Sequence, residues 1–171
     1  MSTRTSGPVE KLFRVTKNPE QTRAFGETIG RRLEGGEVLA LAGEIGSGKT
    51  TLVQGIAKGA GVRSPYVASP TFVLVSTHQG RVTFHHIDLY RLQGNLQIED
   101  LGFFDYLCES AVAVIEWADR AGSLLPAEHL RIDMDLLSES ERRISVCANG
   151  NRYVDLIRTL ERASHGTESE H

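Results

Sequence analysis

The chain lacks the features that would place a protein in a membrane or hold it directly on nucleic acid. No apolar run approaches the roughly 20 residues of a membrane-spanning helix, and residues 1–8 are too polar for a secretory signal peptide. The net charge is −3, and basic residues gather only in pairs such as Arg31-Arg32 and Arg142-Arg143. We therefore expect no membrane association and no direct, charge-driven binding of nucleic acid.

Cysteine is scarce as well, since the chain has only Cys108 and Cys147. They are far apart and do not show the spacing of a metal site or a redox motif. We interpret both as reduced thiols in the core, and this usage favours a cytoplasmic protein. A length of 171 residues suits one domain with a sizeable core.

The chain does contain the phosphate-binding loop pattern G-x-x-x-x-G-K-[ST], which it matches at every fixed position. Gly43 and Gly48 allow tight turns, so that backbone N–H groups can point at phosphate oxygens. Lys49 is expected to reach the β- and γ-phosphates, and the Thr50 hydroxyl can bind Mg²⁺. The predicted nucleotide-binding stretch comprises Gly43, Glu44, Ile45, Gly46, Ser47, Gly48, Lys49, Thr50 and Thr51.

The context of this pattern favours a functional loop over an accidental match. Residues 37–42 form a short apolar run that is typical of a buried parallel strand. After the loop, Leu52, Val53 and Ile56 fall on one face of a predicted helix. The loop thus ends at a helix N-terminus, where unpaired N–H groups and the helix dipole favour an anion.

Strands and helices alternate along the whole chain. Further strands are predicted at 11–16, 73–77, 81–87 and 111–115, with a hairpin of 130–136 and 144–146. Further helices are predicted from Asn18-Pro19 to Gly35-Gly36, at 98–107 and at 153–160. This pattern predicts an α/β fold like that of P-loop NTPases, a three-layer sandwich with a mixed, largely parallel central sheet and an antiparallel edge hairpin. We expect one domain over residues 1–162 and a disordered polar tail over 163–171.

Two acidic residues follow apolar strands and are candidates for the chemistry. Glu116 ends the strand 111–115, and Asp88 ends the strand 81–87. Ligands of open α/β sheets bind beyond the carboxyl ends of the strands, so both acids can face one site. We assign Glu116, with Thr50, to Mg²⁺, and Asp88 to the attacking water or to support of the metal. These two roles can be exchanged, and Lys49 completes the predicted catalytic set.

Four motifs in this order and spacing resemble the TsaE (YjeE) family of small bacterial ATPases, and the resemblance covers roughly residues 12–160. The motifs are Gly43 to Thr51, Ser69-Pro70-Thr71-Phe72, His86 to Arg91 and Ile115-Glu116-Trp117. The resemblance implies ATP and Mg²⁺ as ligands. It also implies a function in threonylcarbamoyladenosine modification of tRNA, exerted on a TsaB–TsaD pair of partner proteins, with tRNA contacted only indirectly.

The resemblance also bears on residues outside the phosphate loop. Thr71 is expected to sense the γ-phosphate. Trp117, the only tryptophan, is expected to pack beside the nucleotide, at a partner surface or simply in the core. His86 has two open interpretations, a hydrogen bond to the phosphate site or a structural role. After Ile-Glu-Trp, family members commonly have Pro-Glu, whereas this chain has Ala118-Asp119.

Two other classes of protein also suit a phosphate loop in a chain of this length. A small-molecule kinase would need a lid with cationic residues over its acceptor. The connection from Leu92 to Asp100 contains no lysine or arginine, which argues against that class. The second class is an interaction module that signals by nucleotide binding without hydrolysis. The acids Asp88 and Glu116 favour hydrolysis of the nucleotide over simple binding, but they do not exclude an interaction module.

Overall fold

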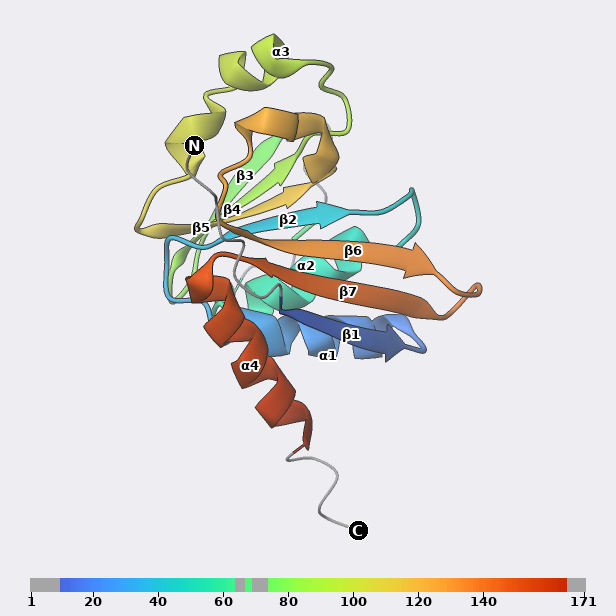
Figure 1. The fold of residues 1–171 in the computed structure, drawn as a ribbon. Helices are drawn as coiled ribbons and strands as arrows, with labels where there is room; N and C mark the ends of the chain where they lie inside the picture. The colour runs from blue at the N-terminus through green and yellow to red at the C-terminus, as the bar shows by residue number, and fades with distance from the viewer. Residues whose placement is uncertain (1–9, 64–66, 69–73, 166–171) are drawn as a thin grey trace, which may run out of the picture.

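The computed structural model describes residues 10–63, 67–68 and 74–165, with the side chains of the last two helical residues left out (Figure 1). Thr71 and the motif around it, residues 69–72, lie outside the described residues. No helix in the described part is long and apolar enough to cross a membrane.

A seven-stranded mixed sheet organises the described residues, in the order β1-β7-β6-β2-β5-β4-β3 (Figure 1). The four middle strands β6, β2, β5 and β4 run parallel to one another. The pairs β1–β7, β7–β6 and β4–β3 are antiparallel. The strands are β1 Lys11–Thr16, β2 Val38–Ala42, β3 Val75–Gln79, β4 Thr83–Asp88, β5 Ala111–Glu116, β6 His129–Leu136 and β7 Arg142–Asn149.

The α/β class is confirmed, but the sheet is only partly parallel, and the predicted position of the hairpin is wrong. The hairpin β6–β7 lies inside the sheet, because β6 pairs with β2 and the whole of β1 pairs with β7. Alternation of apolar and polar residues reports that one face of a strand is covered. It does not report whether the strand has one neighbour or two, so the pattern cannot distinguish the edge strand β1 from the internal strand β7.

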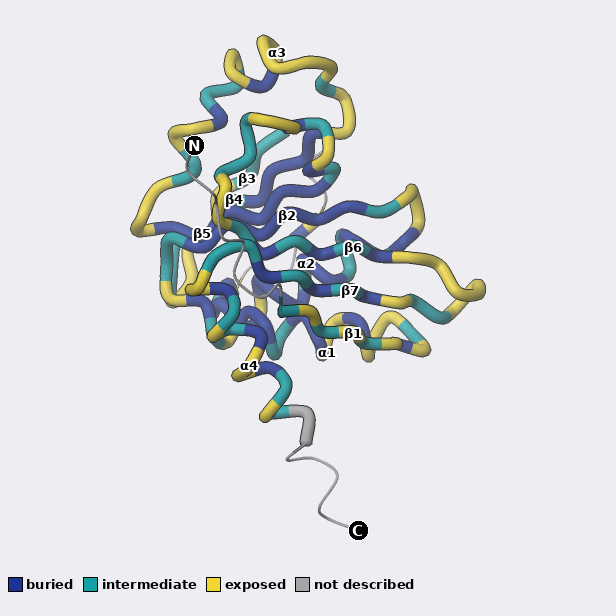
Figure 2. Tube along the Cα trace, viewed as in Figure 1, coloured by how far each residue is buried: buried dark blue, intermediate teal, exposed yellow. Residues whose placement is uncertain are grey.

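Helices and 3₁₀ turns cover both faces of the sheet, but unequally. The larger cluster packs helices α1 (Pro19–Gly30), α2 (Lys49–Gly59) and α4 (Asn151–His165) against one face. The smaller cluster packs α3 (Asn95–Asp100) and the turns η1 (Phe103–Tyr106) and η2 (Ala118–Leu124) against β2, β4 and β5. Figure 2 shows these central strands as the most continuously buried part of the chain.

Several element boundaries differ from those predicted. Asn18 caps α1 as expected, since its side chain accepts a hydrogen bond from the Gln21 N–H at 2.8 Å, but the helix ends at Gly30. The single helix predicted over 98–107 is broken, because Gly102 adopts a left-handed conformation with φ of 76°. Helix α4 continues to His165, so its last turn occupies residues assigned to the tail. Both cysteines are free, as expected, but Cys108 is exposed and Cys147 is only half-buried, so the prediction of core thiols is wrong.

Helices α1 and α2 pack with their backbones in direct contact. A Cβ atom at Gly30 would lie 2.0 Å from the Ile56 carbonyl oxygen, and one at Gly55 would lie 2.1 Å from the Arg23 carbonyl oxygen. Gly26 and Gly59 are equally confined, with backbone oxygens at 2.4 Å and 2.2 Å. Side chains cannot occupy such gaps, so these glycines set the distance between the helices. The phosphate loop leads into α2, and its position therefore depends on this packing.

Arg81 binds the C-terminal ends of α1 and α2. Its guanidinium donates hydrogen bonds to the carbonyl oxygens of Leu33 at 2.6 Å, Gly30 at 3.0 Å and Gly59 at 3.3 Å. Carbonyl groups at helix C-termini lack intrahelical partners and carry partial negative charge, which a cation stabilises. Arg81 therefore joins the turn between β3 and β4 to both helices.

Substitution of Gly30 by alanine tests the backbone contact. We expect Gly30→Ala to lower the free energy of unfolding by roughly 1–3 kcal/mol, the range for overpacked sites, because α1 must move away from α2. Urea denaturation followed by circular dichroism measures the change. Thr28→Ala, on the same helix and away from α2, should change it by less than about 0.5 kcal/mol. Equal stability of the two variants would show that the helices can separate without cost.

Candidate functional site

The carboxyl ends of β2, β5 and β4 meet beside the phosphate loop. Asp88 and Glu116 are direct partners in the register of β4 and β5, and Glu116 also pairs with Leu41 of β2. Both acids are 2% exposed. A cavity of about 460 Å³ opens at this edge. It is lined by Ile45, Gly46, Gly48, Lys49, Thr50, Thr51, Asp88, Tyr90, Glu116, Trp117 and Arg142.

Glycine is required at two fixed positions of the loop. Gly43 has φ of 152°, and a Cβ atom there would lie 2.6 Å from both the Met134 carbonyl oxygen and the Ser47 Oγ. Gly48 has φ of 95° in the left-handed region and stands at the N-cap of α2. These turns direct the chain into α2, whose first residues Lys49, Thr50 and Thr51 line the cavity. The N-terminus of a helix suits an anion, because its first N–H groups have no intrahelical partners.

The Lys49 ammonium lies against the loop itself. Its Nζ donates hydrogen bonds to the carbonyl oxygens of Gly43 at 2.6 Å and Glu44 at 2.8 Å, and to the Ser47 Oγ at 3.3 Å. Burial lowers the pKa of Lys49, while the charges of Glu116 and Asp88 act in the opposite direction. Added negative charge, such as that of a phosphate, would therefore favour the protonated ammonium further.

Glu116 joins the loop helix to a buried histidine. Its Oε1 accepts a hydrogen bond from the Thr50 hydroxyl at 3.0 Å, and its Oε2 lies 2.5 Å from the His86 Nε2. His86 is 0% exposed, and its Nδ1 has no hydrogen-bond partner among the described residues. The histidine thus bonds the carboxylate rather than the loop, and it holds that carboxylate in one orientation toward Thr50.

Asp88 lies beside Glu116 and is held by hydrogen bonds of its own. Its Oδ1 accepts a hydrogen bond from the Tyr90 N–H at 2.8 Å, and its backbone N–H donates to the Leu74 carbonyl at 2.8 Å. Glu116 is the acid that contacts Thr50, and Asp88 lines the same cavity. His85, one residue before His86, faces the opposite side of β4 and bonds Thr77 at 2.9 Å.

Trp117 forms an aromatic wall of the cavity. It follows Glu116 in a left-handed conformation with φ of 58°, and its ring lies 4.9 Å from that of Tyr90. The Lys49 Nζ stands 4.2 Å from the Trp117 ring centre, and the Arg120 guanidinium carbon stands 5.8 Å from it. A cation at such distances is attracted by the ring quadrupole, so Trp117 is held between the loop lysine and Arg120.

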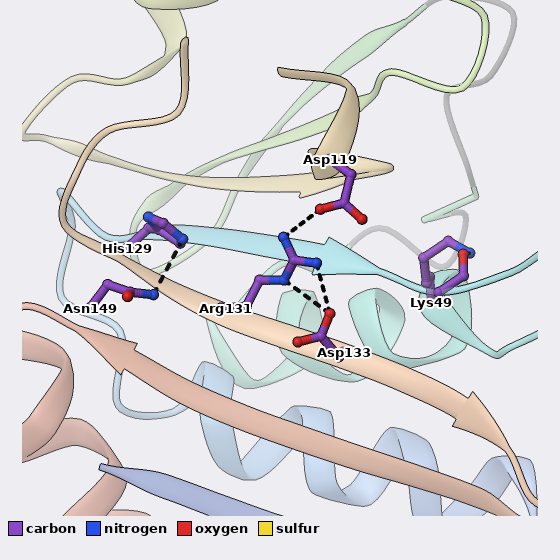
Figure 3. A network of polar contacts seen from close by, with 7 residues as sticks. Lys49, Asp119, His129, Arg131, Asp133 and Asn149 are labelled. Carbon is purple, nitrogen blue, oxygen red and sulfur yellow. Dashed lines mark hydrogen bonds and ion pairs between the residues drawn. The ribbon is translucent and has the colours of Figure 1, made fainter. Parts of the chain in front are cut away.

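The turn after Trp117 is fastened by an ion pair. Arg131 donates to the Asp119 Oδ1 at 2.6 Å and to the Asp133 Oδ1 at 2.8 Å (Figure 3). Burial opposes the charge, but hydrogen bonds to Asp133 and Asp119 raise the pKa of Arg131 above its ordinary value. Asp119, which stands where family members commonly have glutamate, thereby joins the start of η2 to β6, one residue after the alanine that takes the place of the usual proline.

Arg142 is the cavity-lining residue that no sequence pattern indicated as functional. It begins β7, and its Nη2 donates to the Gly46 carbonyl oxygen at 3.2 Å. The pairing of β6 with β2 brings the hairpin alongside the phosphate loop. A single basic residue so far from the loop in sequence carries no local signal, so only the strand order could have revealed it.

These features define an α/β protein whose phosphate-loop motif stands beside two buried carboxylates at the carboxyl ends of parallel strands. The model of the family described as threonylcarbamoyl adenosine biosynthesis protein TsaE matches residues 16–144. The chain therefore belongs to the TsaE family, as the motifs predicted. As a TsaE family protein it has a role in tRNA threonylcarbamoyladenosine biosynthesis.

Individual relatives agree along most of their length. The tRNA threonylcarbamoyladenosine biosynthesis protein TsaE of Bacillus subtilis is 37% identical over 148 residues, which are 86% of this chain and 92% of the relative. That of Treponema pallidum is 36% identical over 132 residues, 77% of this chain and 97% of the relative. The crystal structure of YdiB from Bacillus subtilis has a TM-score of 0.77 at 31% identity, covering 93% of this chain and 99% of that one.

Removal of the loop lysine tests whether the cavity takes phosphates. We expect Lys49→Ala to lose at least about tenfold in ATP affinity, or about 1.4 kcal/mol, because no other group of the loop carries a positive charge. Calorimetric titration of the folded variant measures the loss. Lys58→Ala, in the last turn of the same helix and paired with Glu27 at 3.1 Å, is the matched control and should bind as the wild type does. Wild-type affinity in Lys49→Ala would exclude the phosphate-loop role.

Proposed function

We propose that this protein is an Mg²⁺-dependent ATPase that supports threonylcarbamoyladenosine modification of tRNA by acting on a TsaB–TsaD-type complex. The observation that carries the proposal is the convergence of Lys49, Thr50, Glu116 and Asp88 on one cavity at the carboxyl edge of the sheet. A loop lysine, a hydroxyl, and two buried acids are the groups that phosphoryl transfer from a nucleotide requires.

The oxygen ligands at the cavity fit Mg²⁺ better than a metal ion that needs a full set of protein ligands. The Thr50 hydroxyl and the Glu116 carboxylate offer hard oxygen atoms in mutual contact, and Asp88 lines the same cavity with a second carboxylate. The described residues contain no group of three or more histidine, cysteine and acidic side chains that could hold a metal ion. Mg²⁺ commonly takes one or two protein ligands together with water and substrate phosphates. When bound, it would neutralise charge on the phosphates.

The remaining roles follow from the contacts of each residue. Lys49 exchanges its carbonyl partners on the loop for phosphate oxygens, which accept a stronger, charge-assisted hydrogen bond. Glu116 is kept in place by His86, so that its other oxygen faces Thr50. Asp88 orients or deprotonates the water that attacks the γ-phosphate. Trp117 and Tyr90 form the wall that limits water at the site.

The rival classes have less support. A kinase acceptor lid is not provided by the connection after β4, since its helix α3 turns Ile98 into the smaller core cluster. An interaction module that only binds nucleotide would share the phosphate loop, but it would not require two buried acids at the carboxyl edge of the sheet. Assay of phosphate release with the partner proteins, against a panel of phosphoryl acceptors, separates the three classes.

Substitution of the two acids tests their division of roles. We expect Glu116→Ala to weaken Mg²⁺-dependent nucleotide binding and hydrolysis together, because Thr50 loses its partner. Asp88→Asn should leave binding nearly intact and slow hydrolysis by about 10²-fold, the scale of a lost general base. Calorimetry with and without Mg²⁺ and single-turnover phosphate release measure the two effects.

The exposed acid Asp105 supplies the control for these variants. Asp105→Asn should change neither the Mg²⁺-dependent binding of nucleotide nor the rate of hydrolysis. The opposite pattern, with Asp88→Asn abolishing metal-dependent binding and Glu116→Ala sparing it, would exchange the two roles. Unchanged turnover in both variants would refute the catalytic assignment.

The partner predicted from the family can be tested with the nucleotide as a switch. We expect a TsaB–TsaD-type complex to bind this protein with different affinity in the presence of a non-hydrolysed ATP analogue and of ADP, because coupling between two ligands is reciprocal. Lys49→Ala should remove that difference. The isolated protein should bind tRNA weakly, since its net charge is −3. Equal affinity in both nucleotide states would rule out the switch, and tight binding of tRNA alone would count against a partner-driven function.

A further inference from the structure

Arg142 lies against the phosphate loop through a set of backbone contacts. Its Nη2 donates to the Gly46 carbonyl oxygen at 3.2 Å, within the loop. Its Nη1 lies 3.1 to 3.3 Å from the carbonyl oxygens of Ser138, Glu139 and Glu141, in the turn between β6 and β7. The guanidinium therefore bridges the tip of the hairpin and the loop, and Arg142 and Gly46 both line the cavity.

The positive charge of Arg142 has no acidic partner in the described part of the chain. Within the described residues, its guanidinium donates hydrogen bonds only to backbone carbonyl oxygens. Arg143, the next residue on β7, is by contrast paired with Asp135 at 3.0 Å. Among the residues that line the cavity, Lys49 and Arg142 are the two cations. An unneutralised guanidinium beside a phosphate loop is free to attract an anion.

The strand order decides which phosphates of a bound nucleotide Arg142 can contact. The loop follows β2, which lies between β6 on one side and β5 on the other. Asp88 and Glu116 come from the β5 side, together with the groups assigned to Mg²⁺ and the γ-phosphate. Arg142 comes from the β6–β7 side, and it stands near Gly48, where its Nε would lie 3.7 Å from a Cβ atom. The two sets of charge thus flank the loop.

We propose that Arg142 is a second phosphate-binding cation of this site, acting on the α- and β-phosphates while Lys49 acts on the β- and γ-phosphates. The inference rests on the proposed function, because it takes a nucleotide as the ligand. On binding, the guanidinium keeps its hydrogen bonds to the hairpin turn and adds phosphate oxygens to them. The nucleotide is therefore clamped between α2 and the hairpin.

Calorimetric titration with ATP, ADP and adenosine tests this assignment in the wild type, Arg142→Gln, Arg142→Lys and Arg143→Gln. We expect Arg142→Gln to lose about tenfold in affinity for ATP and for ADP alike, since both carry the α- and β-phosphates, with little change for adenosine. Arg142→Lys keeps the charge and should recover most of that loss. Arg143→Gln, which removes a neighbouring charge on the other face of β7, should bind as the wild type does.

Several outcomes would overturn the inference. Wild-type affinities in Arg142→Gln would remove Arg142 from the site, and a loss for ATP alone would place its charge at the γ-phosphate. Equal losses in Arg142→Gln and Arg142→Lys, with lowered thermal stability in both, would reduce Arg142 to a structural clamp of the hairpin. Failure of the wild type to bind either nucleotide would refute the proposed function itself and this inference with it, whereas binding without hydrolysis would refute only the ATPase activity.

Discussion

Backbone contact between α1 and α2 is the constraint on which the position of the candidate site depends. Four glycines leave no room for side chains between the helices, so α2 has one position relative to α1 and the sheet. Arg81 fixes the C-terminal ends of both helices. The N-terminal end of α2 is then placed where β2 delivers the phosphate loop, close to the ends of β5 and β4.

The site that forms there contains several charged groups out of water. Lys49 is 5% exposed, and Asp88 and Glu116 are 2% exposed. Buried charges are costly unless they are paired and hydrogen-bonded, and each of these groups has such partners. The partners of Lys49 are loop carbonyls, which an incoming phosphate can replace at little cost. The partners of Glu116 are side chains, Thr50 and His86, and these keep its carboxylate oriented before any ligand arrives.

The mixed order of the sheet gives the phosphate loop two different neighbours. Parallel pairing of β2 with β5, and of β5 with β4, supplies the acids, because parallel strands end at the same edge. Parallel pairing with β6 supplies the hairpin that carries Arg142. An antiparallel neighbour at either position would have turned one of these sets of residues to the far edge of the sheet. The cavity thus depends on the directions of the strands beside β2 as much as on the loop.

The sequence by itself determined the local features: the phosphate loop, the cap at Asn18, most strands, and the acids Asp88 and Glu116 at strand ends. Each of these is encoded within a few consecutive residues, where turn geometry and side-chain periodicity act. The structure alone decided that β6–β7 is internal, that the glycines of α1 and α2 face each other, that His86 bonds Glu116, and that Arg142 reaches the loop. These contacts join residues remote in sequence, and strand pairing and close packing fix them only when the whole chain has folded.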